Sequence, residues 1–336
     1  MLKLKKPYLI AEIGSSHMGN LKLAYKSIFE AKKGGADCVK FQIYDEKTIV
    51  HPNLKTLSYI KYNKFKYQAQ RFAKMKISFS NLKKLHLYAK KIKIDFCVTP
   101  FDPNLVKRLS KYVKFFKVAS GDLNYYQLLK EIKKTKKMAF VSTGISKYKD
   151  IENSLKFLNR KKVIIFHCVS SYPTKLEDIN LSNIRELKKR FKIETGFSDH
   201  TQGIEATIAS VFFGVKIIEK HFVPSIGSSK SADYPLSINF KQMQVLRKKI
   251  DQAFLMIGNK KDKILNCEKY GEKNLKRSIY SSQKIKKGSK FNKHNVICLR
   301  PFNNKGEKIE NFYSVLKKRA KKDIGINKLI KRTDLK

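Results

Sequence analysis

Two histidines stand at equivalent points of neighbouring strand–helix units. His200 follows a short strand-like run over 193–198, and His221 follows a buried run over 215–218, with an apolar helical stretch over 204–213 between them. In a barrel of parallel strands the chemistry lies at the carboxyl ends of the strands. Neutral imidazole is the commonest protein ligand for a divalent cation. The pattern therefore favours a two-histidine metal site, and the alternative is two unrelated loop histidines.

Polar side chains recur at the ends of the other expected strands. Lys40 and Lys117 stand inside apolar runs, and both need anionic partners because an unpaired buried ammonium is costly. Hydroxyl side chains beside glycine suit phosphate oxygens, since they donate hydrogen bonds where the backbone can approach closely. These residues predict a site for a phosphate and a carboxylate next to a divalent metal. The remaining strand-end candidates are Glu12, His17, Gln42, Thr99, Ser120, Asp122, Ser142, Thr143, Ser170, Tyr172 and Ser198.

The elements that must position these residues alternate along the chain. Strands are expected over 8–13, 37–44, 94–98, 113–119, 138–142, 162–169, 193–198 and 215–218. Helices are expected over 21–33, from Ser80 to about 91, and over 103–110, 125–133, 149–158, 182–190, 204–213 and 240–256. Strands alternating with helices imply a parallel sheet, and eight such units imply an α/β fold of the closed (β/α)8 TIM-barrel type. An open, doubly wound sheet is the alternative, although no G-x-G-x-x-G follows a strand.

Two stretches depart from the strand–helix rhythm. Residues 45–76 are polar, rich in tyrosine and irregular, and we interpret them as an inserted loop over the site. The barrel domain is expected to span 1–258, and the charged stretch 259–276 is interpreted as a linker. Residues 277–336 then form a small β-rich domain, which is too short to bury a large core alone.

The composition limits the partners. The 336 residues carry a formal net charge of +47, but the lysines are spread along the whole chain, which indicates a compositional bias and no specific nucleic-acid site. Most of the five cysteines lie in apolar runs with no CxxC pair, as expected for buried thiols in a reducing compartment. The N-terminal apolar run is too short for a signal peptide, and no stretch approaches the roughly 20 apolar residues of a membrane helix. A cytoplasmic protein without a membrane partner is expected.

The order and spacing of the motifs resemble the sialic acid synthase family, whose members condense phosphoenolpyruvate with an N-acetylated amino sugar. The C-terminal RSIYSSQKIKKGSKF and VICLRPF resemble the small antifreeze-like (SAF) domain that closes these chains, and the resemblance covers about residues 7–325. The barrel motifs are AEIGSSHMGN, GADCVKFQ, TPFD, FKVASGD, STG, HCVSSYPT, GFSDHT and IEKHF.

The resemblance implies a role for each matching residue. His200 and His221 would bind Mn²⁺ or Mg²⁺, and Arg300 would reach the N-acyl group of the sugar from the other subunit of a domain-swapped homodimer. Residues implied in phosphoenolpyruvate binding are Lys40, Thr99, Lys117, Ser120, Ser142, Ser170 and Ser198. Those implied in catalysis are Glu12, Asp122 and Asp233, and those implied in sugar binding are Gln42, Tyr172, Asp233 and Arg300.

Three departures from the family pattern bear on the sugar. Ser16 stands where the family usually has Asn, Asp122 where many members have Glu, and Ser170 where many have Asn. N-acetylneuraminate is the default product, with legionaminate or pseudaminate, made from a diacetamido-dideoxyhexose, as alternatives. Another phosphoenolpyruvate-condensing barrel synthase and a noncatalytic barrel that binds carbohydrate or polyanions also remain open.

Overall fold

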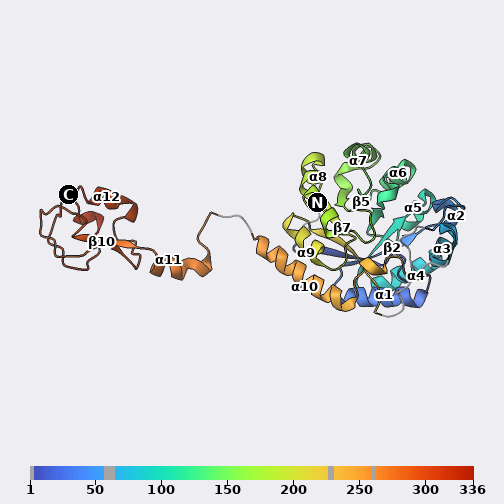
Figure 1. The fold of residues 1–336 in the computed structure, drawn as a ribbon, viewed down its shortest axis with the longest axis horizontal. Helices are drawn as coiled ribbons and strands as arrows, with labels where there is room; N and C mark the ends of the chain where they lie inside the picture. The colour runs from blue at the N-terminus through green and yellow to red at the C-terminus, as the bar shows by residue number, and fades with distance from the viewer. Residues whose placement is uncertain (1–3, 57–64, 226–230, 259–261) are drawn as a thin grey trace. The chain divides into compact units, whose positions relative to one another are not determined.

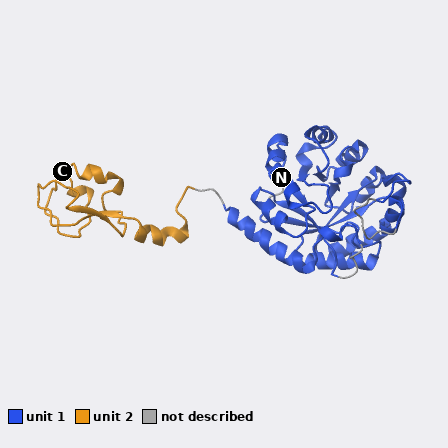
Figure 2. Ribbon diagram, in the orientation of Figure 1, with its two compact units in different colours: residues 1–258 blue, residues 259–336 orange. Residues whose placement is uncertain are grey.

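The computed structural model describes residues 4–56, 65–225, 231–258 and 262–336. The chain divides into two compact units, residues 1–258 and 259–336, which are coloured separately in Figure 2. Each unit is described by itself.

The first unit is a closed barrel of parallel strands in sequence order, as the alternation of elements predicted (Figure 1). Strand β8 pairs with β1 to close it, with Glu12 beside His221 in the register. The strands are β1 (Tyr8–Glu12), β2 (Cys38–Ile43), β3 (Asp95–Pro100), β4 (Phe115–Val118), β5 (Met138–Ser142), β6 (Val163–His167), β7 (Thr195–Asp199) and β8 (Ile217–His221).

Helices surround the strands, and their ends follow local capping rules (Figure 1). The Asn20 side chain accepts hydrogen bonds from the backbone of Lys22 and Leu23 and so starts α1. Ser78, rather than the expected Ser80, caps α4, because its hydroxyl accepts from the backbone of Asn81. The helices are α1 (Leu21–Lys33), α2 (Glu46–Ile49), α3 (Gln68–Met75), α4 (Phe79–Lys91), α5 (Pro103–Leu109), α6 (Tyr126–Lys134), α7 (Tyr148–Leu155), α8 (Asn183–Phe191), α9 (Glu205–Phe212) and α10 (Phe240–Ile257).

The barrel interior is filled by side chains from one face of the strands. Phe140 stacks on Phe115 and Phe166, with ring centroids 4.0 and 5.4 Å apart. Cys38 and Cys97 lie in the same interior cluster as buried free thiols, as the cysteine pattern predicted. A larger cluster packs the opposite face of the strands against the helices. Apolar burial on both faces of a strand is the usual condition of a parallel barrel.

The expectation of an irregular loop over 45–76 is wrong in part. The described residues of this stretch include helices α2 and α3, while residues 57–64 lie outside the described part. The buried positions of α3 are Gln68, Arg71 and Met75, which share one face at helical spacing. Two of these three side chains are polar, so a search for apolar periodicity could not find the helix.

The second unit has a small core of its own. Strands β9 (Ser278–Ser281) and β10 (Val296–Leu299) form an antiparallel pair, and Ile279, Phe291 and Ile330 are among the buried residues. The unit also contains α11 (Lys269–Leu275) and α12 (Phe312–Val315). Helix α11 falls within the stretch that we interpreted as a linker. Across the described residues, no helix is both long enough and apolar enough to span a membrane.

Candidate active site

The inward face of the strands changes from apolar to polar toward the carboxyl ends. Side chains two residues apart lie on the same face of a strand. Ile10 of the interior cluster is therefore followed on that face by Glu12, and Cys38 is followed by Lys40. The same step leads from Cys97 to Thr99, from Phe115 to Lys117, from Phe140 to Ser142, and from Ile217 to Glu219 and His221. The two-residue period of the strands thus places a layer of polar side chains next to the apolar interior cluster, on the side of the carboxyl ends.

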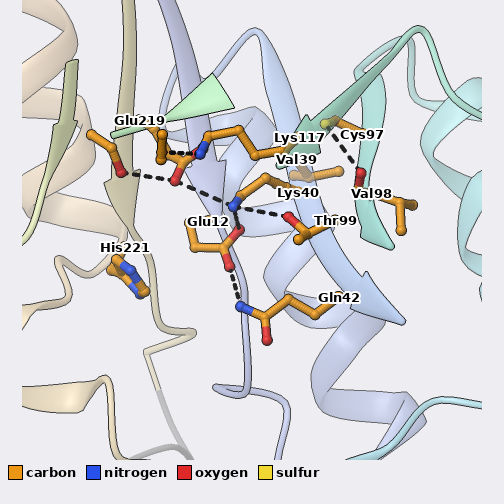
Figure 3. A network of polar contacts seen from close by, with 12 residues as sticks. Glu12, Val39, Lys40, Gln42, Cys97, Val98, Thr99, Lys117, Glu219 and His221 are labelled. Carbon is orange, nitrogen blue, oxygen red and sulfur yellow. Dashed lines mark hydrogen bonds and ion pairs between the residues drawn. The ribbon is translucent and has the colours of Figure 1, made fainter. Parts of the chain in front are cut away.

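Lys40 is the centre of this layer (Figure 3). Its Nζ lies 3.2 Å from Oε2 of Glu12 and 3.2 Å from Oε1 of Glu219, and it donates a hydrogen bond to Thr99. The amide of Gln42 donates to Oε1 of Glu12 at 2.8 Å. Both carboxylates are almost fully buried, at 1% and 3% exposure. The anionic partner that the sequence required for Lys40 is therefore a pair of glutamates from the neighbouring strand β1 and from β8.

The two glutamates sit in different electrostatic surroundings. Burial raises the pKa of Glu12 to about 7, despite the opposing effect of Lys40. Burial acts in the same direction on Glu219, but the ammonium groups of Lys117 and Lys40 outweigh it and lower the pKa of this carboxyl to about 2. Glu219 is therefore a fixed anion. Glu12 keeps its proton to a higher pH than a free carboxyl does, which suits a general acid or base.

Lys117 and a group of hydroxyls form the neighbouring side of the site. Lys117 donates a hydrogen bond to the hydroxyl of Ser142, and burial lowers its pKa. Beyond it, a Cβ added to Gly144 would lie 2.3 Å from Oγ of Ser170 and 2.9 Å from Oγ of Ser120. Oγ of Ser170 is buried and makes no hydrogen bond. Glycine at this position keeps a small polar space open, and the free hydroxyl fits the expected anion site.

The two histidines lie together, as their position at strand ends predicted. Their ring centroids are 5.3 Å apart, and Nδ1 of His200 donates to the carbonyl oxygen of Val169 at 2.7 Å. That bond leaves the lone pair on Nε2. Burial lowers the pKa of His200 to about 4, so its ring is neutral at pH 7. Nδ1 of His221 is buried without a hydrogen bond, 3.9 Å from Oδ2 of Asp233.

This donor set fits a divalent cation that keeps several water ligands. Two neutral imidazoles next to carboxylates suit Mn²⁺ or Mg²⁺ better than a closed structural site. Among the described residues, no group of three or more His, Cys, Asp or Glu side chains has the arrangement of a complete metal cage. Any cation here would thus depend on water or substrate for its remaining ligands.

A buried ion pair braces the two strands that carry the histidines. Nζ of Lys220 lies 3.1 Å from Oδ2 of Asp199, and both side chains are fully buried. Asp199 also accepts hydrogen bonds from the backbone and hydroxyl of Thr201 and from the hydroxyl of Thr207 on α9. Each member of the pair precedes a histidine in the sequence, so the pair connects β7, β8 and α9 directly beside the site.

Asp233 enters the site from outside the strands. Ser15 donates to its Oδ2 at 2.9 Å. A Cβ on Gly14 would lie 3.1 Å from Oδ2 of Asp233 and 3.1 Å from Oε1 of Glu12, and Gly14 has a φ of +50°. Only glycine combines that backbone conformation with so close an approach. The loop after β1 therefore holds two carboxylates near each other at the edge of the site.

These side chains surround a cavity of about 260 Å³. It brings together most of the predicted site residues: Glu12, Lys40, Gln42, Thr99, Lys117, Ser120, Ser142, Tyr172, Ser198, His200, His221 and Asp233. Three predicted residues are not part of its lining. Ser170 lies one step away beside Gly144, Asp122 ends the short helical turn Ser120–Asp122, and Arg300 belongs to the second unit.

The sequence reasoning missed the two further charged residues that line the cavity, Glu219 and Arg71. Glu219 stands two residues before His221, so strand alternation could have placed it on the same inward face. Arg71 lies on α3, and no apolar pattern pointed to it.

Comparisons with known proteins agree with this geometry. The N,N'-diacetyllegionaminic acid synthase of Campylobacter jejuni is 34% identical over 311 residues, which cover 89% of this chain and 92% of that protein. A pseudaminic acid synthase of the same species is 32% identical over 342 residues, covering 99% and 97%. The crystal structure of the N-acetylneuraminic acid (sialic acid) synthetase from Leptospira borgpetersenii superposes with a TM-score of 0.71 at 27% identity and covers 81% of this chain and 93% of that one.

The family model agrees with these relatives and confirms the resemblance drawn from the motifs. It matches residues 27–262, a range that contains most of the barrel and both histidines. The chain belongs to the NeuB family.

Proposed function

We propose that this enzyme condenses phosphoenolpyruvate with an N-acylated amino sugar and water to give a nonulosonic acid and phosphate. Synthases of legionaminic, pseudaminic and sialic acids among its relatives support the reaction class. The observation that carries the proposal is the buried Lys40 between Glu12 and Glu219, beside Lys117 and a group of hydroxyls. This arrangement suits the two anionic groups of phosphoenolpyruvate.

The chain's own residues can take defined parts in this reaction. Lys40 and Lys117 would lie against the carboxylate and phosphate, which is electrostatic preorganisation in a buried site. C3 of phosphoenolpyruvate forms a bond to the aldehyde carbon of the open-chain sugar, and the aldehyde oxygen takes up a proton. Water adds to C2, and the bond from C2 to the phosphate oxygen then breaks. Glu12, with its pKa of about 7, would move the protons near C2 and C3.

His200 and His221 would hold a divalent cation, which supplies Lewis-acid polarisation of the aldehyde when it is bound. Gln42, Tyr172 and Asp233 lie on the same cavity and would contact the sugar. We further propose that the second unit is the SAF-like domain and that a homodimer brings Arg300 of one chain to the sugar site of the other. Sedimentation velocity would test the dimer.

Phosphate release tests the reaction. The wild-type enzyme with Mn²⁺ should release inorganic phosphate from phosphoenolpyruvate only when an N-acylated amino sugar is present, and EDTA should abolish the release. The panel contains N-acetylmannosamine, its 6-phosphate, diacetamido-trideoxyhexoses and a blank without sugar. Phosphate release that does not depend on the sugar would contradict the proposed function. So would a folded protein that releases no phosphate with any sugar of the panel.

A further inference from the structure

Arg71 is a buried cation that the reaction described above does not use. It lies on α3, is 8% exposed and lines the cavity. Its Nη1 donates to Oε1 of Gln68 at 3.3 Å, and its guanidinium lies 5.4 Å from the centre of the Phe72 ring. Its Nε is buried and makes no hydrogen bond. Within the described ranges, no carboxylate approaches the guanidinium closely enough for an ion pair.

Burying a guanidinium without enough hydrogen-bond acceptors destabilises the fold, unless a ligand supplies the missing acceptors. A buried guanidinium offers five N–H donors in a rigid fork and is always charged. Here the structure gives it one side-chain acceptor, Gln68, and leaves the buried Nε without any acceptor. Buried polar groups are nearly always satisfied in folded proteins, and each exception needs an explanation. A ligand oxygen that enters the cavity would supply the missing acceptor.

The surroundings of Arg71 suit an acyl group better than a phosphate. The cavity wall beside it contains Ile49, Phe72 and Met75, which would pack against a methyl group. A phosphate offers three strong acceptor oxygens and is usually held by several donors or cations. Among the described lining residues, the lysines, Lys40 and Lys117, are the ones that we assign to phosphoenolpyruvate, so Arg71 would have to hold a second phosphate without them. The guanidinium can donate to the carbonyl oxygen of an acyl group, and the apolar wall beside it can pack against the methyl of the same group.

The position of α3 indicates which acyl group this would be. The acylamino group next to the aldehyde stays near the strand-end layer, because its nitrogen is on the carbon bonded to the reacting carbon. Helices α2 and α3 lie outside the ring of strands, beside α4 (Figure 1). Arg71 is nevertheless close enough to Asp233 to help lower the pKa of that carboxyl, although burial opposes this. A group that reaches Arg71 is therefore on the part of the sugar away from the aldehyde.

We propose that Arg71, with the wall formed by Ile49, Phe72 and Met75, is a specificity subsite for a second acylamino group on the acceptor sugar. The inference rests on the proposed function and names its substrate class: a diacylamino hexose is preferred over a monoacylated hexosamine or its phosphate. Arg71 is a specificity residue here and takes no part in bond making.

The test compares two sugars in two variants. Arg71→Met keeps the length of the side chain but removes its donors, and Lys74→Met removes an exposed charge from the same helix as the matched control. Arg71→Met should raise the KM for a diacetamido-trideoxyhexose by about 10- to 100-fold, the usual range for a hydrogen bond to a charged group. Its KM for phosphoenolpyruvate, and its kinetics with N-acetylmannosamine, should stay within about twofold of wild type. Lys74→Met should resemble wild type with both sugars.

The outcomes separate this subsite from the reaction itself. An equal loss with both sugars would show that Arg71 contacts a group common to them, and no loss with either would show no contact; both results overturn the subsite and leave the synthase function intact. Calorimetric binding of the diacetamido sugar needs no turnover. Binding that Arg71→Met abolishes, in an enzyme that releases no phosphate, would support the subsite and overturn the proposed reaction. Arg71→Lys, with an intermediate loss, keeps the test valid if the methionine variant does not fold.

Discussion

Replacing Lys40 by Met should destabilise the enzyme in a way that depends on pH. In the wild type its ammonium lies 3.2 Å from one oxygen of each of two buried carboxylates. At an effective dielectric constant of about 20, each contact is worth roughly 5 kcal/mol before the cost of burying the charges is subtracted. Removing one partner from a buried ionic group typically costs about 3–5 kcal/mol, and we expect a loss of that size at pH 8.

The pH dependence follows from Glu12. Its pKa in the folded state is already raised to about 7 from an ordinary 4.5 because the carboxyl is buried. Folding therefore favours the protonated form, and this contribution is present below pH 4.5 and is lost as the pH rises through 7. Without Lys40 the pKa of Glu12 rises further, so the loss extends above pH 7. Lys40→Met should thus cost less stability at pH 6 than at pH 8.

Urea denaturation followed by far-UV circular dichroism measures the effect, since the chain has no tryptophan to report by fluorescence. Adding Glu12→Gln to Lys40→Met should recover much of the lost stability at pH 8, because it removes the carboxylate that has lost its cation. Lys47→Met, which removes an exposed lysine, should change the free energy of unfolding by no more than about 0.5 kcal/mol. An equal loss at pH 6 and pH 8, with no recovery in the double variant, would refute the shared-cation account of the site.

Three further changes test other parts of the site. His200→Ala should weaken Mn²⁺ binding at least about tenfold in isothermal titration calorimetry without substrates, and an unchanged affinity would exclude it as a ligand. Burial raises the pKa of Asp122 to about 6, so its carboxyl favours folding below pH 3.8 and this contribution is lost as the pH rises through 6. Asp122→Asn should accordingly raise the free energy of unfolding, measured by urea denaturation, by about 1–2 kcal/mol at pH 8 and by far less at pH 4. An equal change at both pH values would be evidence against burial as the cause of the raised pKa. Arg300→Ala should raise the KM for the acceptor sugar and leave that for phosphoenolpyruvate unchanged; steady-state kinetics in which both stay constant would remove Arg300 from the site.

The barrel was predictable because buried strand runs alternate regularly with stretches of helical spacing along the chain. Helical spacing between apolar runs identified the alternating units, and the closed order of β1 to β8 confirmed them. Once the barrel is known, every inward-facing side chain at the carboxyl end of a strand must lie at the same mouth. This is why residues far apart in the sequence, such as Glu12 and His221, could be assigned to one site before the structure placed them in one cavity. Their register in neighbouring strands is the physical reason.

Alternation within a strand could have revealed more than we inferred from it. Glu219 and His221 are two residues apart on β8 and therefore share the inward face. The sequence reasoning assigned the histidine as a ligand and gave the glutamate no role. Its importance depends on Lys40 and Lys117 from two other strands, and those contacts exist only in the folded barrel.

Arg71 marks the limit of sequence reasoning here. Strand ends are fixed by the closed barrel, but the segment after β2 has no such constraint, and its helix α3 buries a polar face. A search for apolar periodicity can find only faces that pack against apolar surroundings. A helix whose buried side chains include Gln68 and Arg71 is stable only if that face meets something polar, and here Arg71 lines the cavity. The segment that looked least ordered in the sequence thus contributes Arg71, the residue to which we assign acceptor specificity.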